Sequence, residues 1–248
     1  PDGSKIAIAA ADKSLRLLWK GEAALPWSTF RDCNPYEREL IDLAEMNLTD
    51  AERAVRQRIT SAEFKALLDR EYTLEQKRAI VAILSAIGHG EAYAWLVSAS
   101  LLPEVKSTGA KAALTMQILE EAKHFVVMRE LMQAFNVPIP RQSVWEYLLL
   151  EGALKAKGLD KFFGMNVLVE SIALSIFGLL STLPGLDVLR LFHLDESRHT
   201  ALPANYFKEF PMPRWQKKSP LARLRRLKMA LPALPLIMLL EAELAVLG

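Results

Sequence analysis

Apolar residues recur with helical spacing along most of this chain. From about Glu37 onward, hydrophobic side chains return every three or four residues, the period of an α-helix that packs one face against a core. Segments that alternate apolar and polar residues and end at turn residues, the pattern of β-strands, are nearly absent. The sequence therefore predicts an all-α fold.

Residues that start and stop helices divide this pattern into four long segments. Thr73 and Gln76 have the spacing of a capping box, and Pro103 closes the segment that they open. Pro203 lies inside the fourth segment and removes the hydrogen bond to the carbonyl of His199, so we expect a kink or bulge there. The expected segments are 74–102, 107–135, 160–181 and 185–210, with a short helix at 143–155 before the third.

The remaining residues are expected to pack around these four segments. Half of the chain is hydrophobic (51%), which fits a single domain over 1–248 with a large core. In this division, 1–72 form peripheral helices such as 50–58 and 61–69, 73–210 form a four-helix bundle, and 211–248 form a C-terminal helix.

A five-residue pattern of acid, Glu, any residue, base and His occurs twice, at 120–124 and 195–199. Residues three apart lie on one face of a helix, so the Glu and the His of each copy present an oxygen and a nitrogen to the same point. Such a pair can bind one metal ion. The two pairs are Glu121 with His124 and Glu196 with His199.

Upstream of each copy, one carboxylate lies alone in an apolar helical segment. Glu91 and Glu170 are both flanked by hydrophobic residues at helical spacing. A charged carboxylate on a buried face costs several kcal/mol unless it is paired or bound to a metal. Turns near 103–108 and at Pro184 and Gly185 place each lone Glu at a height similar to that of the Glu across the turn. The alternative is a solvated pair on a helix surface.

Four Glu and two His on four helices are the ligand set of the di-iron carboxylate bundles. The chain resembles the ferritin-like di-iron superfamily. More narrowly, the five-residue motif (Asp or Glu, then Glu, any residue, Arg or Lys, and His) resembles that of the oxygen-activating branch, which includes monooxygenases, desaturases and arylamine N-oxygenases. The resemblance implies two Fe ions, or a Mn/Fe pair, and leaves open which Glu residues bridge them. The implied ligands are Glu91, Glu121, His124, Glu170, Glu196 and His199.

The resemblance also implies partners for the ligand imidazoles. In related enzymes the acidic residue before the ligand Glu pairs with the His of the opposite helix, which assigns Asp195 to His124 and Glu120 to His199. The alternative for both acids is a solvated helix edge. His193 stands three residues before Glu196 and is a candidate additional ligand, although arylamine N-oxygenases place their extra His four residues before that Glu.

These features lead us to expect an oxidoreductase that uses O2 to hydroxylate, N-oxygenate or desaturate a small organic substrate. No nucleotide-binding fingerprint is present, so electrons are expected from a separate reductase or ferredoxin. The alternatives are a ferroxidase or peroxide-scavenging protein without an organic substrate, and a scaffold without metal. An apolar or aromatic substrate is expected in a pocket between the ligand helices, for which six side chains are candidates although the pattern favours plain core for each: Trp95, Phe125, Met128, Leu174, Phe177 and Phe192.

Charge and cysteine content add little about partners. The net charge is +2, and the single Cys33 fits a reducing, cytoplasmic compartment. A basic cluster at 217–228 precedes the apolar run 231–240, which is too short to span a bilayer. This segment is expected to pack on the bundle, on a second subunit in a homodimer, or on an anionic membrane surface. We expect no nucleic-acid partner, although the basic cluster gives weak support to an RNA-modifying hydroxylase.

Overall fold

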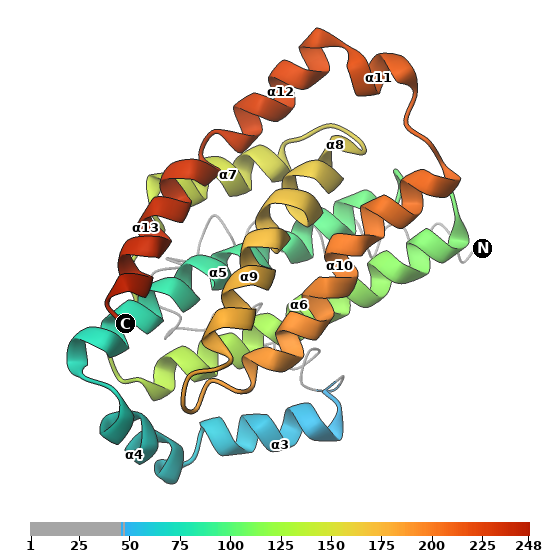
Figure 1. Cartoon of the computed structure of the whole chain (residues 1–248). Helices are drawn as coiled ribbons and strands as arrows, with labels where there is room; N and C mark the ends of the chain where they lie inside the picture. The colour runs from blue at the N-terminus through green and yellow to red at the C-terminus, as the bar shows by residue number, and fades with distance from the viewer. Residues whose placement is uncertain (1–45, 47) are drawn as a thin grey trace.

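A computed structural model of the chain describes residue 46 and residues 48–248. Within these residues all regular secondary structure is helical, which confirms the all-α prediction (Figure 1). The expected helices before Asp50 and the lone Cys33 lie outside the described residues.

Twelve helical elements follow one another in the described chain. They are α3 (Asp50–Ile59), α4 (Ala62–Glu71), α5 (Leu74–Leu101), α6 (Thr108–Ala134), α7 (Val144–Leu154), α8 (Asp160–Phe162), the π-helix η1 (Phe163–Val169), α9 (Glu170–Leu180), α10 (Leu189–Glu209), α11 (Arg214–Lys218), α12 (Pro220–Ala230) and α13 (Ala233–Ala245).

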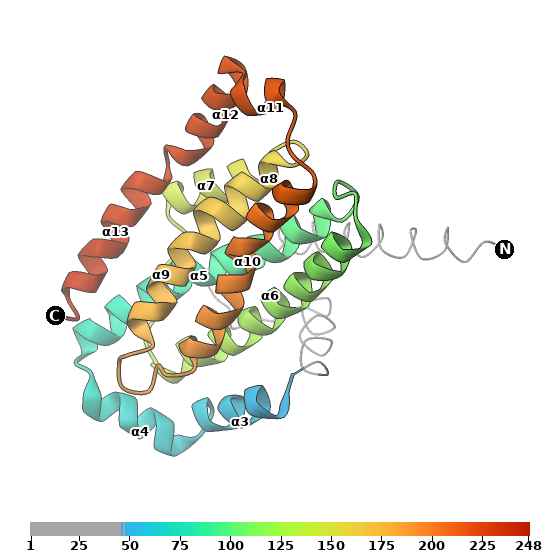
Figure 2. The same cartoon turned by 45° about the vertical axis from the view of Figure 1, so that its right-hand side comes forward.

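The longest elements surround the core. Helix α5 packs on α6, and α10 packs on both α9 and α6, so that these helices lie side by side (Figures 1 and 2). Helices α3 and α4 cross one end of this group, whereas α7, α12 and α13 cover the side formed by α5 and η1. The core is filled by large aliphatic and aromatic side chains, including Leu84, Met128, Phe162 and Phe177.

Side-chain caps start the helices where the sequence predicts. Thr73 and Gln76 form the expected capping box of α5, and Ser107 caps α6 by accepting from the backbone N–H of Ala110. Both helices end within one residue of the predicted position. Each cap satisfies backbone N–H groups that would otherwise lack partners at a helix start.

Two of the predicted segments differ from the structure. The third is interrupted by η1, whose wider turn the apolar spacing did not reveal. The fourth begins at Leu189 instead of Gly185, because Gly185 adopts a left-handed conformation (φ +79°) and short turns follow it.

The single C-terminal helix predicted for 211–248 is wrong. Three helices, α11 to α13, occupy this stretch. Pro220 begins α12, and Pro232 lies at the break between α12 and α13. Proline lacks the N–H that continues a helix, and it disfavours helical geometry in the preceding residue.

Two segments are long and apolar enough to cross a membrane by length and composition alone. They are Leu74–Leu101 and Asp160–Leu180, and the apolar windows within them are 78% and 50% buried in the structure. Core helices of globular proteins have the same properties, so this is weak evidence for a membrane span. Both segments pack in the core and carry the buried residues Glu91 and Glu170.

Candidate metal centre

Six buried side chains from four helices meet in the middle of the core. Helix α5 supplies Glu91, α6 supplies Glu121 and His124, α9 begins with Glu170, and α10 supplies the last two residues. They form two groups that could each hold a metal ion, with ligand atoms within 4.8 Å of one another. The groups are Glu91, Glu121, His124 and Glu196, and Glu121, Glu170, Glu196 and His199.

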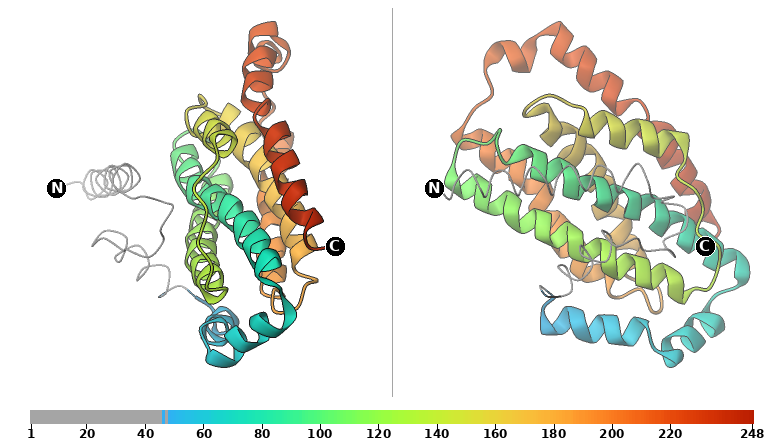
Figure 3. Two further views of the ribbon diagram at one scale, coloured as in Figure 1. Left: turned by 90° about the vertical axis from the view of Figure 1, so that its left-hand side faces the viewer. Right: turned by 180° about the vertical axis from the view of Figure 1, so that it is seen from behind.

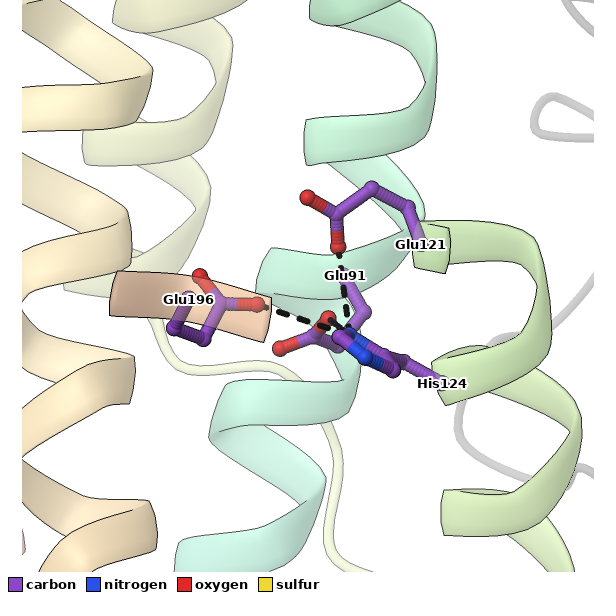
Figure 4. A group of neighbouring side chains, drawn as sticks. All are labelled: Glu91, Glu121, His124 and Glu196. Atoms are coloured by element: carbon purple, nitrogen blue, oxygen red, sulfur yellow. Dashed lines mark hydrogen bonds and ion pairs between the residues drawn. The ribbon is translucent and has the colours of Figure 1, made fainter. Parts of the chain in front are cut away.

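The imidazole of His124 faces the carboxylates of the first group (Figure 4). Its Nδ1 lies 2.9 Å from Glu91 Oε2, 3.6 Å from Glu121 Oε2 and 3.4 Å from Glu196 Oε1. Its Nε2 points the other way and lies 3.0 Å from Asp195 Oδ2. The nitrogen that faces the carboxylates of the group is therefore Nδ1, which shares a hydrogen bond with Glu91.

His199 has the same arrangement in the second group. Its Nδ1 lies 3.1 Å from Glu121 Oε1, without hydrogen-bond geometry, and its Nε2 lies 2.8 Å from Glu120 Oε2. The predicted hydrogen bonds of Asp195 to His124 and of Glu120 to His199 are thus confirmed. A carboxylate on the second ring nitrogen fixes the tautomer that leaves the first nitrogen as a ligand.

A single guanidinium connects the two supporting acids. Arg198 donates to Glu120 Oε1 at 2.8 Å and to Asp195 Oδ1 at 2.5 Å. The matching base of the other motif, Lys123, instead pairs with Glu52 of α3 at 2.7 Å. Both motifs therefore turn the Nδ1 of their His toward the shared carboxylates, but their outer contacts differ.

Electrostatics in this cluster favour cations. Burial and the negative charges of Glu196 and Glu121 raise the pKa of Glu91 well above its usual range, and that of Glu170 in the same way. Burial lowers the pKa of His124, but hydrogen bonds to Asp195 and the surrounding carboxylates outweigh it and raise the pKa well above its usual range. The cluster thus concentrates negative charge that protons or metal ions must neutralise.

The donor atoms fit metal ions. Glu121 Oε2, Glu170 Oε2 and both carboxylate oxygens of Glu196 are buried without a hydrogen-bond partner among the described residues. A buried oxygen left without a partner costs about 1–3 kcal/mol, or more when charged. Four carboxylates with two neutral imidazoles also balance the charge of two divalent cations. These buried groups could therefore hold metal ions.

Two buried amides that the sequence analysis did not assign support the ligands. Gln117 Nε2 donates to Glu170 Oε1 at 2.5 Å and lies 3.4 Å from Glu121 Oε1. Asn166, inside η1, donates to Gln117 Oε1 at 3.1 Å and to the backbone carbonyl of His199 at 3.0 Å. Each amide stands four residues before a ligand Glu, a spacing that was available as a signal in the sequence.

The contact from Asn166 explains how α10 accommodates Pro203. Proline at this position has no N–H for the carbonyl of His199, four residues earlier. The side chain of Asn166 supplies the missing donor, and α10 continues to Glu209.

His193 is not in either group. Its Nδ1 lies 2.9 Å from the carbonyl of Leu174, to which it donates, so the ring turns toward the backbone of α9. The prediction that His193 is an additional ligand is therefore wrong. His89 also lies outside both groups, with its Nδ1 3.1 Å from Glu146 Oε2.

A small apolar cavity reaches the carboxylates from the side of α7 and α13. Its volume is about 30 Å³, and the carboxylates of Glu91, Glu121, Glu146 and Glu170 are part of its lining. Leu236 and Leu240 of α13 form part of its wall. The six residues predicted to line a pocket do not line this one. Four of them are buried core side chains, and Phe192 packs on the His124 ring with centroids 4.3 Å apart.

No protein-family model matches this chain, and neither the curated proteins nor the solved structures yield a match. The repeated motif and the geometry of the buried groups are therefore the features that indicate a function.

Proposed function

We propose that the protein is a non-haem di-iron oxidoreductase with a ferritin-like four-helix bundle, which activates O2 to oxidise an organic substrate. The observation that carries this proposal is the sharing of Glu121 and Glu196 by two adjacent ligand groups. Each group adds one further Glu and one His. This matches the arrangement of di-iron carboxylate proteins, with two bridging and two terminal carboxylates.

Each ligand and its support has a separate task. Glu91 with His124, and Glu170 with His199, would each serve one metal ion, and the two shared carboxylates would serve both. Asp195 and Glu120 hold the imidazoles with Nδ1 toward the site, and Arg198 holds these two acids together. Two irons bound there would supply the electrons and open positions that dioxygen reduction needs.

The lining of the cavity indicates which substrates would suit the site. Apart from the carboxylates, its walls are almost entirely hydrophobic, formed by side chains such as Ile87, Leu149, Ala173 and Leu236. Such a lining excludes water from the ligands and favours a small apolar molecule. Electrons would come from a separate reductase or ferredoxin.

One observation favours a second candidate, a ferroxidase or peroxide-scavenging protein. A cavity of about 30 Å³ is of a size for a water or dioxygen molecule and not for an organic substrate. An oxygenase therefore requires the cavity to widen when a substrate binds, whereas a ferroxidase does not.

Metal content of the purified chain after loading with ferrous iron tests the site. We expect about two irons per chain in the wild type. Glu121→Ala and Glu196→Ala should lose both, because each residue belongs to both groups, whereas Glu91→Ala and Glu170→Ala should retain about one. Glu146→Gln and His89→Gln are matched controls, since both residues are buried but lie outside the groups.

Two results of this experiment would contradict the proposal. Wild-type protein without iron above background would exclude a di-iron centre, and equal losses in the controls would show that the effect is one of folding. With iron bound, O2 consumption that depends on an added apolar compound supports the oxygenase. O2 or peroxide consumption that depends only on ferrous iron supports the second candidate.

A further inference from the structure

The C-terminal helices carry an exposed surface that the metal centre does not explain. Between Glu209 and Glu241 the sequence has seven basic residues and no acidic one. The basic residues are Arg214, Lys217, Lys218, Arg223, Arg225, Arg226 and Lys228. A stretch of this charge attracts an anionic partner.

An apolar stripe runs along the same helices. Its side chains are between 57% and 67% exposed, and they follow one another at intervals of three or four residues, which places them along one side of α12 and α13. They are Leu221, Leu224, Leu227, Leu231, Leu234 and Met238. A surface of several adjacent exposed leucines is uncommon on a protein that functions without a partner there.

The position of these helices leaves the stripe accessible. Helices α12 and α13 run one after the other along the outer edge of the molecule, and α12 projects beyond the core (Figures 1 and 3). Arg226 fastens α12 to the core through two hydrogen bonds to Asp160 Oδ1, at 3.0 and 2.7 Å. Apart from Arg225, which lies 3.7 Å from Asp160, the other basic residues of the stretch form no ion pair within the described part of the chain.

A groove beside the stripe combines both features. It lies between α7 and α12, has a volume of about 610 Å³, and has Trp145, Leu148 and Met229 in its lining. Lys155 and Lys228 are among the cations around it. Aromatic and apolar side chains bordered by Lys and Arg are typical of surfaces that lie at the interface of a bilayer.

We propose that α12 and α13 dock the protein on an anionic phospholipid membrane. The leucine stripe would enter the boundary between headgroups and acyl chains, and the cations would contact lipid phosphates. The structure disfavours a second copy as the occupant, because a two-fold contact through this face would bring the basic cluster against itself. Helix α13 has 13 residues and spans about 20 Å, short of the ~30 Å hydrocarbon layer, so it lies on the membrane.

The same helix lies between the membrane face and the metal centre. Leu236 and Leu240 form part of the wall of the apolar cavity, while Leu234 and Met238 of the same helix are exposed. A membrane-dissolved apolar molecule would therefore reach the carboxylates by passing α13. This consequence for the substrate class rests on the proposed function, whereas the docking itself does not.

Co-sedimentation of the full chain with vesicles tests the docking. We expect binding to vesicles of phosphatidylcholine with phosphatidylglycerol, weaker binding to phosphatidylcholine alone, and a decrease with added salt. The triple variant Lys217→Gln, Lys218→Gln, Arg223→Gln should bind about a hundredfold more weakly, at ~1 kcal/mol per cation. Its control replaces three exposed lysines elsewhere by Gln: Lys65, Lys111 and Lys208.

Matched apolar variants complete the test. Leu224→Ser with Leu227→Ser should reduce vesicle binding, whereas Leu179→Ser with Leu194→Ser, similarly exposed on α9 and α10, should leave it unchanged. Equal binding to neutral and anionic vesicles, or none to either, overturns the proposal. Two other results would overturn it: a dimer in solution that dissociates only in the Leu224→Ser, Leu227→Ser variant, or binding to RNA without binding to vesicles. The assay is repeated on Glu121→Ala protein, where unchanged vesicle binding separates the docking from the metal chemistry.

Discussion

The replacement of a backbone hydrogen bond by Asn166 can be tested by a double-mutant cycle with Pro203. In the wild type, Asn166 donates to the His199 carbonyl that Pro203 leaves without its helical partner. The variant Pro203→Ala restores the backbone N–H. If the Asn166 amide and the backbone N–H of residue 203 donate to the same carbonyl, the free energy of unfolding that Asn166→Ala removes must depend on whether Pro or Ala is at position 203.

The structure gives the expected magnitude. Asn166 is completely buried and donates two hydrogen bonds, so Asn166→Ala leaves two buried acceptors short of a donor. At about 1–3 kcal/mol for each unsatisfied group, the single variant should lose roughly 2–6 kcal/mol of the free energy of unfolding. In the Pro203→Ala background only the contact with Gln117 is lost, and the loss should be smaller by about 1–3 kcal/mol.

Urea unfolding followed by circular dichroism and tryptophan fluorescence measures the four proteins. Coincident transitions from the two probes would justify a two-state free energy for a chain of this size. A control cycle combines Ser85→Ala with Pro203→Ala, because the Ser85 hydroxyl donates to the carbonyl of Pro140 and shares no partner with Pro203. Additivity of Asn166→Ala and Pro203→Ala within about 0.5 kcal/mol would refute the shared carbonyl.

Three further predictions concern charge and packing. Burial raises the pKa of Glu52, but hydrogen bonds from Lys123 and Thr49 outweigh it and lower the pKa below its usual value. Glu52→Gln should therefore lower the free energy of unfolding by about 1 kcal/mol near neutral pH, and by nothing once acid has protonated Glu52. Urea unfolding at a series of pH values measures this difference. Leu236→Ala should enlarge the cavity and lower the free energy of unfolding by about 2–5 kcal/mol, and unchanged stability would place α13 off the core. Burial lowers the pKa of His199, but the nearby charge of Glu121 and the hydrogen bond to Glu120 outweigh it and raise the pKa. Metal binding near neutral pH should therefore release protons, and the affinity should fall by up to about tenfold per pH unit for each proton released as the pH is lowered. Calorimetry in two buffers counts those protons, and a pH-independent affinity would exclude histidine as a ligand.

The grouping of the six candidate ligands was predictable because it depends on short-range geometry. A separation of three residues fixes the relative direction of Glu121 and His124 on one helix, and the turn positions fix the heights of the lone carboxylates. The hydrogen bonds of Asp195 and Glu120 across to the opposite His came from the family resemblance, and the structure has both. These features need only the helix boundaries, which caps and prolines mark well.

Features that depend on packing between distant helices were not predictable. The partner of a buried amide such as Gln117 is chosen by whichever helix lies opposite, and nothing local identifies that helix. His193 has the spacing of a ligand, but its ring binds the Leu174 carbonyl. Part of the cavity wall likewise comes from α7 and α13, outside the four long segments, because these helices pack on the side formed by α5 and η1.

The two halves of the site differ in a way that the repeated motif conceals. Glu91 lies in the regular helix α5, whereas Glu170 directly follows the π-helix. Asn166 and Pro203 belong to this second half as well, joined through the His199 carbonyl. Local irregularities of this kind lower stability and persist where function requires them. Their concentration around Glu170 and His199 makes the surroundings of this candidate group differ from those of the group with Glu91 and His124, although both groups consist of three Glu and one His.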